Sequence, residues 1–120
     1  MILETGNRIL IVHRRLFEED KTRYFLGEVD KYESGLVKVT GHSWVQDKFD
    51  GKVVRKNDLR TKIFSLVSGT LLIYELPSRV NLKTVRFDQT DEGMLFLTDG
   101  PQFHMDLTEK GHRKASPKNR

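Results

Sequence analysis

Histidines are the side chains best suited to metal binding in this chain, because it has four of them and no cysteine. His104 and Asp106 are two residues apart, and two such residues on a β-strand share one face. A third ligand, His42 or His13, would reach them only if the right strands were neighbours. Because no known ligand spacing is present, we expect His104 and Asp106 to lie on a solvated strand face, and we expect no metal and no cofactor.

Nucleophilic catalysis has little support in the sequence. A serine nucleophile needs a neighbouring base, and no G-x-S-x-G motif is present. Ser34 and Ser68 lie in predicted turns, where serine is a common residue. No glycine-rich phosphate loop leads into a helix. These residues favour a binding or interaction module over an enzyme, and a small metal-dependent enzyme built on His104 and Asp106 is the weakest alternative.

Four basic residues, Arg55, Lys56, Arg60 and Lys62, flank a break at Asn57-Asp58. If they lie on facing arms of a hairpin, they form a compact cationic patch. Such a patch can hold a phosphate, an acidic protein or a nucleic-acid backbone. The alternative is a solvated strand edge, where lysines prevent pairing with other chains.

The only tryptophan, Trp44, lies on a predicted strand, on the face opposite Val37 and Val39. Beside the basic patch, Trp44 would provide a stacking surface for single-stranded nucleic acid. The alternative, which we favour, is that Trp44 seals one end of the core or lies in a protein–protein interface.

The formal net charge of +4 comes entirely from the C-terminal end. The thirteen residues from Thr108 hold five bases and one acid, whereas residues 1–107 hold sixteen of each. We therefore divide the chain into one domain, residues 1–107, and a basic tail, residues 108–120, whose composition predicts disorder. Within the tail, Lys110, Arg113 and Lys114 would add a sequence-independent attraction for an anionic partner.

Charge is also unevenly distributed within the domain. Residues 52–62 carry five bases and one acid, and residues 88–106 carry five acids and no base. We therefore expect a body that is neutral as a whole but polarised.

Short runs of alternating apolar and polar residues, separated by turn residues, predict about eight or nine strands and no helix. Such spacing is typical of a small antiparallel β-barrel or a strongly curved sandwich. Gly27 and Gly41 fall inside predicted strands and suit a sharp bend at a barrel corner. The expected strands are 8–16, 22–32, 36–45, 53–56, 61–67, 70–76, 85–89, 94–98 and 103–107.

Two turns stand out as hairpin connections. Glu33-Ser34-Gly35 separates the two longest alternating runs, and its glycine allows a positive φ. Ser68-Gly69 is a plausible two-residue turn joining strands 61–67 and 70–76.

These observations predict a non-enzymatic binding module that contacts an anionic partner, such as nucleic acid or an acidic protein, through the basic patch and the tail. The alternative from another class is an assembly subunit that forms a homo-oligomer or part of a complex. No apolar run approaches the roughly 20 residues of a membrane span, and no secretory signal is visible. We therefore expect a cytoplasmic protein without membrane contact.

Overall fold

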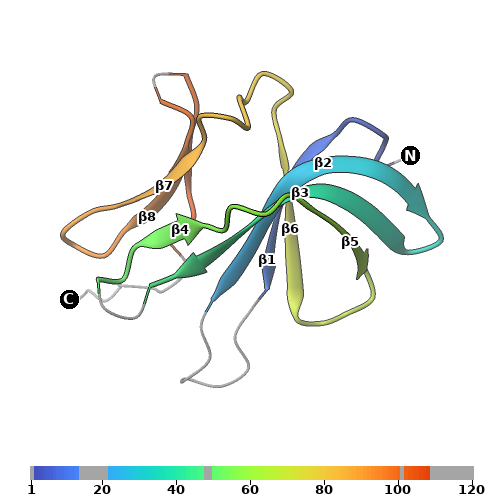
Figure 1. Cartoon of the computed structure of the whole chain (residues 1–120), viewed down its shortest axis with the longest axis horizontal. Helices are drawn as coiled ribbons and strands as arrows, with labels where there is room; N and C mark the ends of the chain where they lie inside the picture. The colour runs from blue at the N-terminus through green and yellow to red at the C-terminus, as the bar shows by residue number, and fades with distance from the viewer. Residues whose placement is uncertain (1, 14–21, 48–49, 101, 109–120) are drawn as a thin grey trace, which may run out of the picture.

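Two antiparallel sheets make up the described part of the chain, and no helix occurs in that part (Figure 1). The computed structural model describes residues 2–13, 22–47, 50–100 and 102–108. The larger sheet has the strand order β4-β3-β2-β1-β6, with β5 also paired to β3. The smaller sheet has the order β7-β8-β9. The all-β prediction is confirmed.

The larger sheet contains β1 (Arg8–His13), β2 (Arg23–Glu33), β3 (Leu36–Gln46), β4 (Val53–Arg55), β5 (Arg60–Ser65) and β6 (Leu71–Leu76). The smaller sheet contains β7 (Arg86–Gln89), β8 (Leu95–Thr98) and β9 (His104–Asp106). Each of these nine strands overlaps one of the strands expected from the alternation.

The β2–β3 hairpin forms as predicted. Its two turn residues, Ser34 and Gly35, have φ angles of 49° and 81°. Two successive positive φ angles match the twist of the strands that such a turn joins. A bulge between Val29 and Lys31 then shifts the alternation along β2. As a result Tyr32 packs in the cluster of Val29, and not on the face of Tyr24 as strict alternation predicts.

The pair Gly27 and Gly41 lies where β2 and β3 approach each other most closely. The two residues are directly opposite each other in the register. A Cβ atom on Gly41 would lie 2.0 Å from the carbonyl oxygen of Leu26. A Cβ atom on Gly27 would lie 2.3 Å from the carbonyl oxygen of Thr40. Only glycine fits this close contact, and both strands curve strongly in Figure 1.

Each face of the larger sheet carries its own apolar cluster. One cluster joins larger-sheet residues such as Leu10 and Trp44 to smaller-sheet residues such as Phe87 and Leu97. We call this side the outer face. The other cluster includes Phe64 of β5 and Ile73 of β6, two strands that pair with different neighbours. The sheet must therefore curl around this second side, which we call the inner face.

The curled sheet is not a closed barrel. β5 pairs with β3 and β6 pairs with β1, and no pairing links β5 to β6 among the described residues. The predicted Ser68-Gly69 hairpin is therefore wrong. The reason is that the segment between Ser65 and Leu71 leads from β5, which pairs with β3, to β6, which pairs with β1 at the far edge of the sheet.

Parts of the predicted organisation lie outside the described residues. The expected extension of the first strand to residue 16 and the tail residues 109–120 belong to this group. Within the described ranges, no helix is long and apolar enough to cross a membrane.

Candidate anion-binding site

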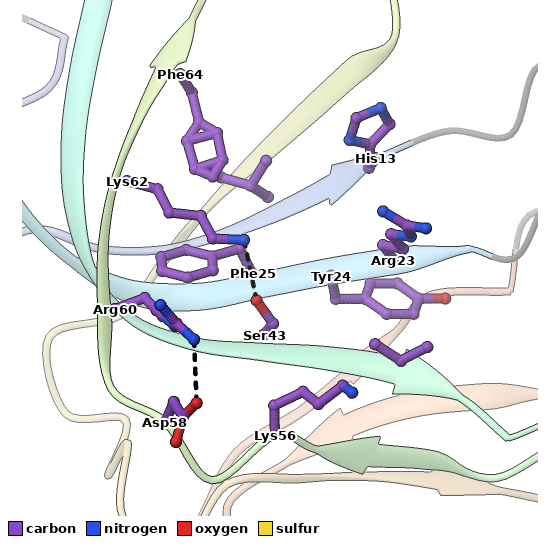
Figure 2. A pocket seen from close by; sticks show the side chains of 12 residues that line it. His13, Arg23, Tyr24, Phe25, Ser43, Lys56, Asp58, Arg60, Lys62 and Phe64 are labelled. Carbon is purple, nitrogen blue, oxygen red and sulfur yellow. Dashed lines mark hydrogen bonds and ion pairs between the residues drawn. The ribbon is translucent and has the colours of Figure 1, made fainter.

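A pocket of about 830 Å³ opens at one end of the inner face of the larger sheet (Figure 2). Strands β1, β2, β3 and β5 and the segment between β4 and β5 form its walls. The residues that line it are Ile11, His13, Arg23, Tyr24, Phe25, Ser43, Val45, Lys56, Asp58, Arg60, Lys62 and Phe64.

Basic side chains dominate this pocket. Four of its lining residues, Arg23, Lys56, Arg60 and Lys62, are permanently basic at neutral pH, and Asp58 is the single acid among the lining residues. Arg60 Nη2 donates to Asp58 Oδ2 at 3.1 Å, but both side chains are more than half exposed. Exposed ion pairs of this kind contribute little energy, so an incoming anion can replace Asp58. The pocket therefore has an excess of positive charge.

The Lys62 side chain extends from β5 over the ring of Phe25, as Figure 2 shows. Its Nζ atom lies 5.2 Å from the ring centroid of Phe25, in a cation–π arrangement. The same ammonium donates to Ser43 Oγ at 3.2 Å. The Phe64 ring packs against Phe25 with centroids 5.4 Å apart. An ammonium has three donors, so Lys62 is held in place and can still bind an anion.

The predicted basic patch is divided by the sheet. Lys56, Arg60 and Lys62 line the pocket, but Arg55 does not. Arg55 is directly opposite Trp44 in the β3–β4 register, and opposed residues lie on the same face. Arg55 therefore belongs to the outer-face side. The condition for one compact patch, facing arms of a hairpin, is not met, because β4 and β5 pair with successive parts of β3 and not with each other.

Trp44 lies in the outer-face cluster and is only 7% exposed. Its ring packs at a tilt against Phe87, with centroids 5.1 Å apart. Trp44 does not line the pocket, so the structure agrees with the interpretation of this residue as part of the core.

Sequence reasoning missed the pocket residues on the long strands. Arg23 and Phe25 share a face of β2 and lie opposite Val45 and Ser43 of β3. His13 comes from the end of β1. The two-residue spacing of Arg23 and Phe25 was visible in the sequence, but only the strand order and the curvature of the sheet bring these residues into one pocket with β5.

His104 and Asp106, the weak candidates for a metal site, are not grouped with a third metal ligand among the residues that the structure describes. His104 and Asp106 are both exposed on β9, and Asp106 Oδ1 accepts a hydrogen bond from the backbone amide of Thr108 at 2.8 Å. Across the described ranges, no three His, Asp or Glu residues are grouped as metal ligands would be. The tail bases Lys110, Arg113 and Lys114 lie outside the described residues.

No protein-family model matches this chain, and no curated protein or solved structure is significantly similar to it. Functional conclusions therefore depend on the geometry of the pocket and of the strands around it.

Proposed function

We propose that this domain is a binding module that holds an anionic partner in the inner-face pocket. One observation carries the proposal. Arg23, Lys56, Arg60 and Lys62 are separated by up to 39 positions in the chain but line one concave pocket with a single acid, Asp58. Concave, positively charged sites concentrate anions and increase their association rates.

Binding fits the contacts in this pocket better than catalysis does. The contact that most resembles a catalytic pair joins Ser43 Oγ and Lys62 Nζ at 3.2 Å. A lysine that activates a serine must be desolvated, so that it can take up the hydroxyl proton. Lys62 is exposed to solvent, so the contact with Ser43 positions a charged ammonium. That arrangement suits the attraction of an anion.

Fluorescence anisotropy across a salt series tests the proposal, with two labelled probes: an acidic peptide and a single-stranded oligonucleotide. The pocket variant is Lys56→Gln with Lys62→Gln. Its matched control is Lys38→Gln with Arg55→Gln, which removes the same charge from exposed positions outside the pocket. We expect the pocket variant to weaken binding of the preferred probe by about tenfold or more, roughly one charge-assisted hydrogen bond. The control should change affinity by less than about twofold.

Equal losses in the pocket variant and its control would contradict the proposal, because binding would then follow total charge. A third full-length variant replaces the tail bases Lys110, Arg113 and Lys114 by Gln. If the affinity is lost only in this variant, the tail and not the pocket binds the anion. If the pocket binds phosphates of a single strand, each contact that a substitution removes should also reduce the slope of log affinity against log salt concentration by about 0.7.

A further inference from the structure

On the side of β5 away from β3, the main-chain groups pair with no strand among the described residues. Leu66 N donates to Gly35 O at 2.8 Å, which fixes the alternation of hydrogen bonds between β3 and β5. In an antiparallel pair only every second residue bonds to the neighbouring strand. Arg60, Lys62 and Phe64 therefore bond to β3, and Thr61 and Ile63 direct their N–H and C=O groups away from it. Among the described residues, β5 has no neighbour on that side.

The two bases of β5 lie on one face of this edge, and an exposed isoleucine lies on the other. Arg60 and Lys62 point to the inner face, where they line the pocket. Ile63 points to the opposite face and is 65% exposed, which is unusual for an isoleucine in a strand. The edge therefore presents two bases on the inner face and Thr61 and Ile63 on the opposite face, together with the outward main-chain groups of Thr61 and Ile63.

We propose that the edge of β5 binds an extended acidic segment of another protein as an additional antiparallel strand. This inference rests on the proposed function, because it names the partner that the basic pocket holds. An apolar residue of the added strand would lie opposite Ile63 and exchange both main-chain hydrogen bonds with it. An acid one position after that apolar residue would then lie opposite Lys62, and an acid three positions after it would lie opposite Arg60. Main-chain bonds give such complexes affinity, and alternating side chains give them specificity.

Charge complementarity favours this occupant over a second copy of the chain. β5 contains two bases and no acid. Two β5 strands paired antiparallel through Ile63 would place the two Lys62 side chains on neighbouring diagonal positions of one face, where like charges repel. An acidic strand replaces that repulsion with opposite-charge pairs. An acid of the added strand can also take the place of Asp58 in its exposed ion pair with Arg60, because both are carboxylates.

Nucleic acid fits this site less well than a peptide does. Single-stranded nucleic acid is usually held by bases that stack on exposed aromatic rings. Phe25 is 4% exposed beneath Lys62, and Trp44 is 7% exposed on the other face. Neither ring offers an open face to a base, and Phe64, the partly exposed ring of the pocket, packs against Phe25. The main-chain groups of Thr61 and Ile63, in contrast, suit an extended peptide.

Three peptides test strand addition on the full-length protein. The first alternates four Glu and three Val residues. The second is methylated on the Val amide nitrogens, which would face β5, and the third on the Glu amide nitrogens, which would face solvent. We expect the first and third peptides to bind with affinities within about threefold of each other, and the second at least about tenfold more weakly, the loss of one main-chain hydrogen bond or more. Binding should also slow amide exchange at Thr61 and Ile63.

A substitution in the protein makes the reciprocal test. Ile63→Pro removes the outward N–H donor and leaves intact the hydrogen bonds that Lys62 and Phe64 make to β3, and proline is tolerated on a strand edge in that orientation. Ile63→Val is the matched control, because it keeps the donor and the β-branched shape. We expect Ile63→Pro to weaken binding of the first peptide at least about tenfold, and Ile63→Val to change the affinity for it by less than about twofold. Unchanged amide exchange at Val37 and Val39 of β3 would show that the sheet is intact.

The outcomes separate this inference from the proposed function. If all three peptides bind equally and Ile63→Pro has no effect, the pocket binds acids without strand addition, and only the inference fails. If the oligonucleotide binds and no peptide does, the partner is a nucleic acid and the inference fails. If no anionic probe binds, both fail. A dimer in light scattering that Ile63→Pro dissociates would identify a second copy as the occupant of the edge and overturn the inference.

Discussion

The two faces of the larger sheet start from the same strands but are completed differently. On the outer face, Trp44 and Leu26 are covered by the smaller sheet and lie in a cluster that is sealed from solvent. On the inner face, Phe25 is covered by the sheet's own curvature and by Lys62. Since the sheet does not close, the inner face keeps an open end. The comparison teaches that one strand can supply core on one side and a binding site on the other.

Charge follows the same division. Of the five bases in segment 52–62, four belong to β4, β5 and the residues between them, and three of these line the pocket. The acids of segment 88–106 belong to the smaller sheet and its turns, where Asp88 accepts from Arg86 at 3.0 Å. The predicted polarity of the body therefore corresponds to two structural units. The following substitutions test the comparison of the two faces.

The largest expected effect belongs to the glycine contact that both faces share. In Gly41→Ala, the new Cβ would lie 2.0 Å from a main-chain oxygen, so β2 and β3 must separate. We expect destabilisation by about 4 kcal/mol or more, measured by urea denaturation. Gly69→Ala is the control, because no atom lies within 4 Å of its new Cβ and its φ is not positive. Equal denaturation midpoints for the two variants would contradict the close approach.

The next effect compares one aromatic residue on each face. Trp44→Ala opens a cavity in the sealed outer face, and we expect a loss of about 3–5 kcal/mol. Phe64→Ala affects a side chain that is only partly buried on the inner face, so we expect about half of that loss. Urea denaturation of both variants, with equal slopes, measures the difference. A larger loss for Phe64→Ala would mean that the inner face is the better-sealed side.

The smallest effect on stability is expected at Lys62, which lies over Phe25 in the pocket. Lys62→Met keeps an unbranched chain over Phe25 and removes the charge. Because Lys62 is exposed, the free energy of unfolding should change by less than about 0.5 kcal/mol. Affinity for the anionic probe that the protein prefers should fall in the same variant, as anisotropy would show. A large loss of stability with unchanged affinity would make Lys62 a structural residue.

Several features of the fold were predictable because they depend on local patterns. Alternation of apolar and polar residues located all nine strands, and the positive-φ pair at Ser34-Gly35 fixed the β2–β3 register through a short turn. The predicted bend at Gly27 and Gly41 matches a contact that excludes any side chain. The Ser68-Gly69 hairpin was wrong because adjacent strands in sequence need not pair, and only the sheet order decides this.

The sequence by itself determined the all-β class and the approximate strand positions, since these follow from the alternation of residue types, and it singled out Lys56, Arg60 and Lys62 as neighbouring bases. Only the tertiary structure decided that Trp44 is buried, that Arg55 lies on the other face, and that Arg23 joins the pocket. The physical reason is that a strand's alternation defines two faces but not what covers each one. That depends on the curvature of the sheet and on pairing between strands distant in the chain, and neither is encoded in a local pattern.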